Sequence, residues 1–118
     1  ACHQPEGQGL VGLAPPLVNS RWVNDDERVV ARIVLNGKAN DTLVMPTLRA
    51  VLDDEAIANV LTYVRNSWGH AAGAVSPKVV ADARAASAKR EEPWTDEDLA
   101  QLVQELGPVR RRGPRKQE

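Results

Sequence analysis

The amino-acid sequence predicts an all-α protein, and three observations support this fold class. Four segments combine a helix-capping residue with apolar residues at helical spacing. No segment shows the alternation of apolar and polar residues that marks a strand, and there is no internal repeat. The chain has three Trp, one Tyr and no Phe among 118 residues, so we expect something other than aromatic packing to complete its small core.

The first of these helices is predicted over residues 24–37. Residues 1–24, with scattered glycines and prolines, are expected to form an irregular loop before it. Asn24 or Asp25 is suited to cap the helix, and Gly37 to end it. The β-branched side chains are also compatible with a strand, but the capping residues favour a helix. Its apolar stripe consists of Val29, Val30, Ile33 and Val34.

The clearest helix is predicted over residues 53–69, after a loop in which Pro46 follows the only methionine, Met45. Asp53 or Asp54 caps it, and Gly69 supplies a left-handed stop. Its apolar stripe, at i, i+3, i+4, i+7 and i+11, consists of Ile57, Val60, Leu61, Val64 and Trp68.

Two further helices follow a short linker. Ser76 and Pro77 form a cap and first-turn pair for a helix that ends near Ala88. Thr95 and Asp98 approximate a capping box at the start of the last helix, which is expected to run to residue 107.

The charges are unevenly distributed. Residues 1–109 hold ten basic and fifteen acidic side chains, and five of the fifteen basic residues lie in the last nine positions. An acidic domain argues against a nucleic-acid partner, because such a face needs clustered cations. We expect the basic tail to be solvated and disordered.

Other classes are excluded by composition. No apolar stretch approaches the roughly 20 residues that span a bilayer, so we expect no transmembrane segment, and no signal peptide is visible. The single cysteine excludes an internal disulfide framework. The chain opens without Met, which suggests a fragment of a longer protein.

A glycine motif, "GQGLVG" at residues 7–12, matches the dinucleotide-binding pattern Gly-x-Gly-x-x-Gly. That pattern works between a buried strand and a helix N-terminus. Only six residues precede it here, and Pro15 and Pro16 make an immediate helix unfavourable. We therefore expect these glycines to serve another close approach of the backbone.

A family resemblance rests on a series of features that follow one another along the chain. They are Cys2-His3, the glycine loop, "PPL", a capped helix, "LVMP" and a long amphipathic helix. This arrangement resembles class I cytochrome c, an all-α fold whose attachment motif is Cys-x-x-Cys-His. Cys2 and His3 match the last two positions of the motif. The first cysteine is expected two residues before Ala1, and the N-terminal helix of the family also lies outside this chain.

The resemblance implies a covalent haem c with His3 and Met45 as the axial iron ligands and Cys2 as a thioether. The two ligands are 42 positions apart, which leaves room for the chain to pass around the haem edge. Pro15, with Pro16 as the alternative, is expected to accept the Nδ1 proton of His3. The remaining implied haem contacts are Gly7, Gly9, Gly12, Leu17, Trp22, Arg32 and Leu61.

The same resemblance implies roles for further side chains. Arg21, Trp22 and Arg32 are candidates to neutralise the haem propionates. Val64 and Trp68 are expected to face haem and core with Leu61, and Tyr63 to lie near a helix crossing. Structural roles are expected for His70, just past a helix stop, and for Trp94, as an anchor of the C-terminal helices.

A narrower likeness appears in phrases such as "LAPPLVNSRWV" and "VLTYVRNSWGH". They resemble the haem domain at the C-terminus of planctomycete envelope dehydrogenase-like proteins. This implies a periplasmic or cell-envelope location, and a redox partner protein or upstream dehydrogenase domain as electron donor. The expected organisation is a haem domain over 1–70, a helical extension over 71–107 and a basic tail over 108–118.

The function implied is electron transfer, because two filled axial positions leave no site for substrate on the iron. The chain is thus expected to be an electron carrier rather than a catalyst in its own right. Two alternatives stay open from the sequence: peroxidase-like chemistry after Met45 dissociates, and a haem-free helical interaction module.

Overall fold

Helices dominate the computed structural model, which describes residues 2–11 and 14–108. Within these residues there are five helices and one two-stranded antiparallel sheet, which confirms the all-α prediction. Among them, no helix is long and apolar enough to cross a membrane. The elements are α1 (Arg21–Asn24), α2 (Glu27–Asn36), β1 (Lys38–Ala39), β2 (Val44–Met45), α3 (Asp54–Arg65), α4 (Pro77–Ala86) and α5 (Asp96–Leu106).

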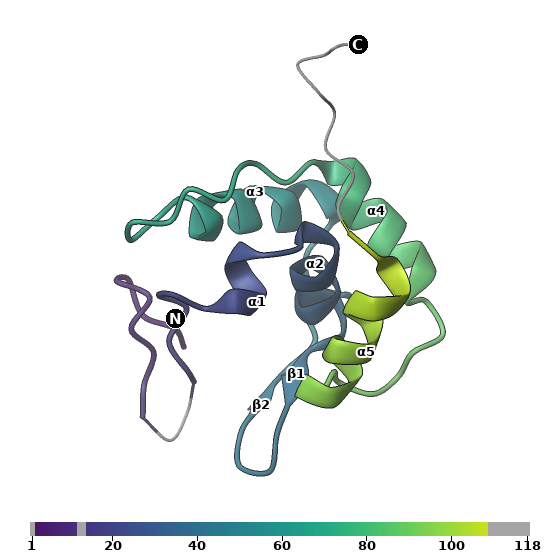
Figure 1. Cartoon of the computed structure of the whole chain (residues 1–118), viewed down its shortest axis with the longest axis horizontal. Coiled ribbons are helices and arrows are strands. Elements are labelled where there is room, and N and C mark those ends of the chain that lie inside the picture. Colours follow the sequence, from purple (N-terminus) through teal and green to yellow (C-terminus); the bar gives the residue numbers. More distant parts are fainter. Residues whose placement is uncertain (1, 12–13, 109–118) are drawn as a thin grey trace.

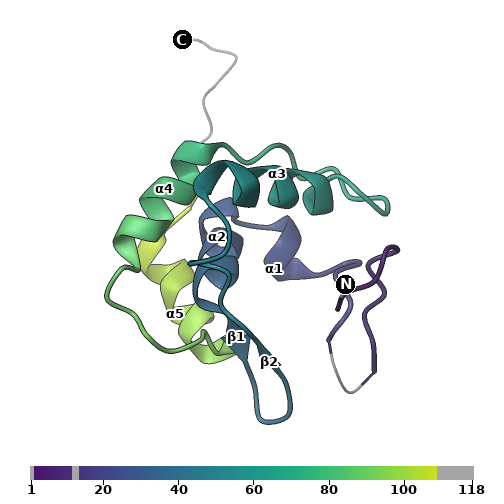
Figure 2. The ribbon, with the colours of Figure 1, turned by 180° about the vertical axis from the view of Figure 1, so that it is seen from behind.

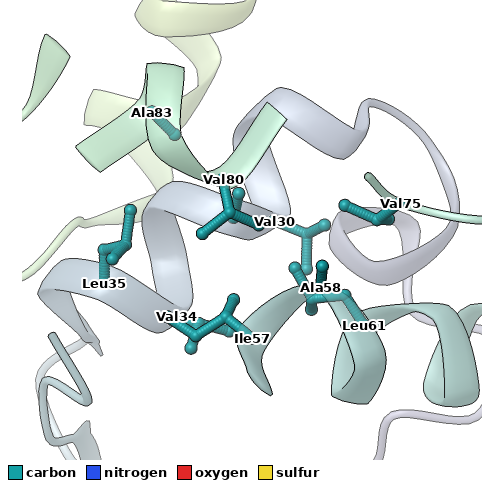
Figure 3. Packing of buried hydrophobic residues seen from close by; sticks show 10 residues of the cluster. Val30, Val34, Leu35, Ile57, Ala58, Leu61, Val75, Val80 and Ala83 are labelled. Carbon is teal, nitrogen blue, oxygen red and sulfur yellow. The ribbon is translucent and has the colours of Figure 1, made fainter. Parts of the chain in front are cut away.

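Helix α2 lies at the centre of the molecule, with α3, α4 and α5 around it (Figure 1). One of its faces packs against α3 and α4, and Figure 3 shows how their small aliphatic side chains interlock. Because α4 contributes to this core, the C-terminal helices pack directly onto the predicted haem domain. The buried cluster comprises Val30, Ala31, Val34, Leu35, Ile57, Ala58, Leu61, Val75, Val80 and Ala83.

The other face of α2 packs against α5 and the residues just before it. Here Val29 and Ile33 of α2 meet Trp94, Leu99 and Leu102, all buried. Trp94 anchors the C-terminal segment as predicted: it is 8% exposed, and its Nε1 donates to the carbonyl of Arg32 at 3.0 Å.

Most helix boundaries follow the predicted caps. The Asp53 carboxylate accepts from Ala56 N at 2.8 Å, and the Ser76 hydroxyl accepts from Val79 N at 3.3 Å. Thr95 and Asp98 form the predicted capping box, with both reciprocal bonds present. These contacts join residues three positions apart, so sequence alone locates them.

Three local predictions were wrong. The cap of α2 is Asp26, which accepts from Arg28 N at 2.9 Å, because Asn24 is already the last residue of the short helix α1. Helix α3 ends at Arg65, four residues before Gly69, and α4 ends at Ala86 rather than near Ala88. In α3 the apolar pattern, which includes Trp68, continues past the point where the helical hydrogen bonds stop.

The sheet was also missed, because strands of two residues are too short to show alternation. β1 and β2 form a hairpin in which Lys38 pairs with Met45 and Ala39 with Val44. The Asn40 side chain closes the turn by accepting from Thr42 N and Leu43 N, each at 2.8 Å. The hairpin therefore fixes the backbone of Met45.

Candidate functional site

The N-terminal loop holds His3 by its backbone and by its ring. His3 Nδ1 lies 2.8 Å from the carbonyl oxygen of Pro15, so the predicted bond is present and Pro15, not Pro16, is the acceptor. Gly9 N donates to the carbonyl of His3 at 2.9 Å. With Nδ1 donating, Nε2 carries the ring's lone pair, which is the arrangement of a metal-binding histidine.

Gly9 allows the two limbs of this loop to touch. Its φ is +72°, and a Cβ there would lie 2.7 Å from the carbonyl carbon of Pro15 and against the Ala14 oxygen. Leu10 and Ala14 close the loop with a pair of hydrogen bonds of 2.8 and 2.9 Å. Glycine at this position therefore brings Pro15 within reach of His3, while Gly12 lies outside the described residues.

We predict that Gly9→Ala destabilises the holoprotein by at least about 2 kcal/mol, because it combines a left-handed φ with a backbone clash. Gly73→Ala is the matched control: its φ is +91°, but no described atom lies within 4 Å of a Cβ built there. Urea unfolding measures both variants. Equal losses in the two would show that the loop tolerates a methyl group at residue 9.

Gly7 makes a close approach of a different kind. A Cβ on it would lie 2.7 Å from Cε3 of Trp68, whose Nε1 donates to the carbonyl of Pro5 at 3.0 Å. The indole of Trp68 thus covers the glycine that was expected to face the macrocycle. Trp68 itself lies beyond the end of α3, with φ +53°, and it clamps the N-terminal loop rather than extending the helix stripe.

Leu17 lies at the exit of the loop and is half-buried. Its N–H donates to the carbonyl of Gly7 at 2.7 Å, and that of Val18 reaches the same oxygen at 3.2 Å. Cys2 at the other end of the loop is exposed, with a free thiol. The loop therefore presents a thiol and an oriented imidazole in consecutive residues.

Met45 is half-buried at the end of β2 and packs against both core clusters. Gly37 makes room for it: φ is +82°, and a Cβ there would meet the Met45 carbonyl oxygen. Just downstream, Leu48 N donates to the carbonyl of Val34 at 3.0 Å, and the Thr47 hydroxyl donates to that of Leu35. The backbone on both sides of Met45 is thereby tied to the end of α2.

His70 has partners for both ring nitrogens. Nδ1 lies 3.0 Å from the carbonyl of Val64, and Nε2 accepts from Asn19 N at 2.9 Å. The ring therefore joins the segment after α3 to the loop before α1. This is the structural role predicted for His70.

The expected propionate contacts are spread over α1 and α2. Trp22 Nε1 donates to Asp96 at 3.2 Å, and the guanidinium of Arg21 stacks on the Trp22 ring at 4.3 Å. The hydrogen bond from Lys38 is the main cause that holds the pKa of Asp96 below its ordinary value, and Trp22 adds to it. The indole N–H of Trp22 thus already has a carboxylate partner.

Arg32 and Leu61 are less accessible than the loop residues. Arg32 is half-buried and donates to the carbonyl of Arg28 at 3.1 Å, and burial lowers the pKa of its guanidinium. Leu61 is 2% exposed within the core cluster of Figure 3. Val60 and Tyr63, on the same helix, are exposed.

The two halves of the predicted ligand set come from separate parts of the fold. The N-terminal segment with His3 and the β1–β2 hairpin with Met45 form two projections on the same side of α3, as both views show (Figures 1 and 2). The segments that join them along the chain include α1 and α2.

The donor set fits haem c. An accessible thiol directly precedes an imidazole whose Nδ1 is held by a backbone carbonyl, and a thioether stands on a tied-down hairpin. Thiol, imidazole and thioether are the groups through which c-type haem is attached and ligated. Cys2 would tether the group, and His3 and Met45 would bind its iron.

Two curated relatives are named as cytochrome c subunits. The chain is 32% identical over 84 residues to "Alcohol dehydrogenase (quinone), cytochrome c subunit" of Gluconobacter oxydans, covering 64% of this chain and 18% of that protein. It is 32% identical over 97 residues to "Gluconate 2-dehydrogenase cytochrome c subunit" of Pantoea cypripedii, covering 71% of this chain and 21% of that protein. The chain spans about a fifth of the length of these curated relatives.

The family comparison covers the loop, the hairpin and most of α3. Residues 1–64 match the family described as "Cytochrome C oxidase, cbb3-type, subunit III". This match favours the haem-binding interpretation over a haem-free helical module. Since it covers more than half of the residues, the chain belongs to this family and is a cytochrome c domain whose cofactor is covalently bound haem c.

Proposed function

We propose that this domain carries single electrons through a haem attached at Cys2 and ligated by His3 and Met45. When bound, haem c supplies a one-electron redox couple. The observation that carries the proposal is the 2.8 Å contact between His3 Nδ1 and the Pro15 carbonyl. It fixes the tautomer and the ring orientation in which Nε2 is free to bind a metal.

Met45 completes the ligand set in this proposal. A soft thioether favours the reduced iron and raises the potential relative to oxygen or nitrogen ligands. If His3 and Met45 both bound the iron, the protein would leave no coordination site there for substrate or peroxide. The function supported best is therefore electron transfer rather than catalysis at the iron.

The proposal also includes the other residues that were predicted to contact the haem. Gly9 brings Pro15 to His3, and Leu17 supplies apolar contact to the macrocycle. Leu61 was predicted to do the same, but at 2% exposed within the core it has little surface left for such a contact. Arg32 and the Arg21–Trp22 pair face the propionates. Gly7 belongs to the same loop, and Trp68 covers it. The close backbone approach predicted for Gly12 stays a prediction.

We also propose the setting in which the domain works. A cysteine two residues before Ala1 completes the Cys-x-x-Cys-His motif, and the N-terminal helix of the family precedes it. The relatives named as dehydrogenase cytochrome c subunits support a dehydrogenase domain or subunit as donor. The terminal haem domain of planctomycete envelope proteins is the proposed type, with residues 1–70, 71–107 and 108–118 as its parts, in the periplasm or cell envelope.

The full-length holoprotein tests this proposal. Its pyridine haemochrome should show covalent haem, with a band position that reports two thioethers rather than one. Spectroelectrochemistry should give a reversible couple with a Nernst slope of about 59 mV per tenfold change in the oxidised-to-reduced ratio. Fast binding of carbon monoxide by the reduced protein, or turnover of peroxide by the resting protein, would indicate an open iron site and contradict the proposal.

A further inference from the structure

The C-terminal extension touches the hairpin that carries Met45. β1 has β2 on one edge, with Lys38 opposite Met45, and Trp94 on the other edge in a parallel bridge to Lys38. Ala39 N donates to the carbonyl of Trp94 at 2.8 Å, and Trp94 N donates to that of Gly37 at 2.9 Å. Trp94, two residues before α5, therefore pairs with β1 in an isolated bridge.

Side chains reinforce this edge. Lys38 Nζ lies 2.8 Å from Asp96 Oδ1, and the Lys38 side chain is only 22% exposed. Trp94 is fixed in turn, because its ring is buried beside α2 and the Arg90 guanidinium stacks on it at 3.7 Å. The residue that pairs with β1 is therefore itself held in place by α2 and Arg90.

The chain downstream of Met45 is held by α4. Arg84 Nη1 donates to the carbonyl of Arg49 at 2.8 Å, and Arg49 Nη1 donates to that of Arg84 at 3.2 Å. Arg49 Nη2 reaches the Ser87 hydroxyl at 2.6 Å, and Arg84 Nη2 reaches the carbonyl of Leu52 at 2.9 Å. Arg84 also pairs with Asp54 at 2.7 Å. This reciprocal pair fixes residues 49–54 to the extension.

We propose that residues 76–107 are a positioning element for the Met45 ligand, holding the segment 38–54 at both of its ends. The inference rests on the proposed ligation by His3 and Met45. A competing ligand can replace Met45 only if this segment moves, so every contact that anchors the segment opposes the exchange. Asp96 and Arg84 act through Met45 and do not touch the iron.

Imidazole titration of the full-length ferric holoprotein tests the upstream anchor. Asp96→Asn should bind imidazole about two- to fivefold more tightly than wild type, the range expected from a partly exposed ion pair. Glu97→Gln is the matched control, because it removes the same charge from the same helical turn and Glu97 has no ion pair or hydrogen bond among the described side chains. Its imidazole affinity should equal that of wild type.

Arg84→Met tests the downstream anchor with the same titration. Because several hydrogen bonds from a charged group are lost, imidazole should bind about tenfold more tightly. Lys78→Met is the control on the same helix, where Lys78 is 82% exposed and pairs only with Asp82 among the described residues. Urea unfolding runs in parallel, because a merely structural role would lower stability without changing the imidazole affinity or the midpoint potential.

The outcomes separate the two proposals. If the wild type shows the far-red band of a sulfur–iron bond, but Asp96→Asn and Arg84→Met bind imidazole as their controls do, the positioning role is wrong and the ligation stands. If the wild type lacks that band, the ligation is wrong and the positioning role falls with it. Tighter imidazole binding in both variants, with unchanged controls, supports the positioning role.

Discussion

Replacing Met45 with alanine is expected to abolish the far-red band of the ferric holoprotein and to lower its midpoint potential by on the order of 0.1 V. Axial ligands set haem potentials over a range of about 0.8 V, so loss of a thioether is a large change. The thioether favours the reduced iron, and alanine offers no donor in its place. Visible spectroscopy and a spectroelectrochemical titration measure the two effects.

Two further variants separate ligation from packing. Met45 packs against both core clusters, so alanine also removes apolar contact. Met45→Leu keeps the volume and should show the same spectral loss without the packing defect that alanine introduces. Val44→Ala, at a neighbouring residue that is 67% exposed, should leave spectrum and potential unchanged. A Met45→Leu protein with the spectrum and potential of wild type would show that the sulfur does not bind the iron.

Much of the helical fold could be predicted because its signals are local. The caps at Asp53, Ser76 and Thr95 each accept from a backbone N–H three positions later. Such contacts are determined by neighbouring residue types, whatever the rest of the chain does. The start of α2 was misplaced because three consecutive polar residues all qualify as caps, and only the fold decides that the third is used.

The hairpin could not be predicted for the opposite reason. Its second edge is formed by Trp94, far along the chain, and its strands are two residues long. The stability of such a short ladder depends on tertiary contacts rather than on strand propensity. The Asn40 turn was the only local signal available, and a turn alone does not indicate which segments pair.

In the candidate site, too, contacts within one segment could be predicted from the sequence, and contacts between distant segments could not. The bond from His3 to Pro15 spans twelve positions within one loop, and the family resemblance was sufficient to predict it. The contact of Trp68 with Gly7 and Pro5 joins the two ends of the predicted haem domain. Helical periodicity placed Trp68 on the α3 stripe, because the pattern does not reveal that the helix ends three residues earlier.

The buried role of Arg65 was not predicted, because a basic residue in the last turn of a helix is usually solvated and interacts with the helix dipole. Here it is 4% exposed, and it joins helix α1 to the segment that follows α3. Nη1 donates to the carbonyl of Val23 at 2.9 Å, and Nη2 to that of Ala72 at 2.8 Å. Burial lowers the pKa of its guanidinium, and it has no carboxylate in direct contact among the described residues.

Replacing Arg65 with methionine is therefore expected to lower the free energy of unfolding of the holoprotein by about 3–5 kcal/mol, because buried carbonyls lose charge-assisted hydrogen bonds. Urea unfolding followed by circular dichroism measures the loss. Amide hydrogen exchange should rise first in residues 19–25 and 70–73, the segments that Arg65 joins.

Two matched variants show whether the donor geometry is the cause. Arg65→Lys keeps the charge but offers a single ammonium, which cannot reach the carbonyls of Val23 and Ala72 at once, so it should recover only part of the loss. Lys78→Met removes an exposed cation, 82% exposed and paired with Asp82, and it should cost no more than about 1 kcal/mol. If Arg65→Met were no more destabilising than Lys78→Met, the carbonyls of Val23 and Ala72 would be satisfied without the guanidinium. Helix α1, and the path that leads the chain from the His3 loop to α2, would then be held by other contacts.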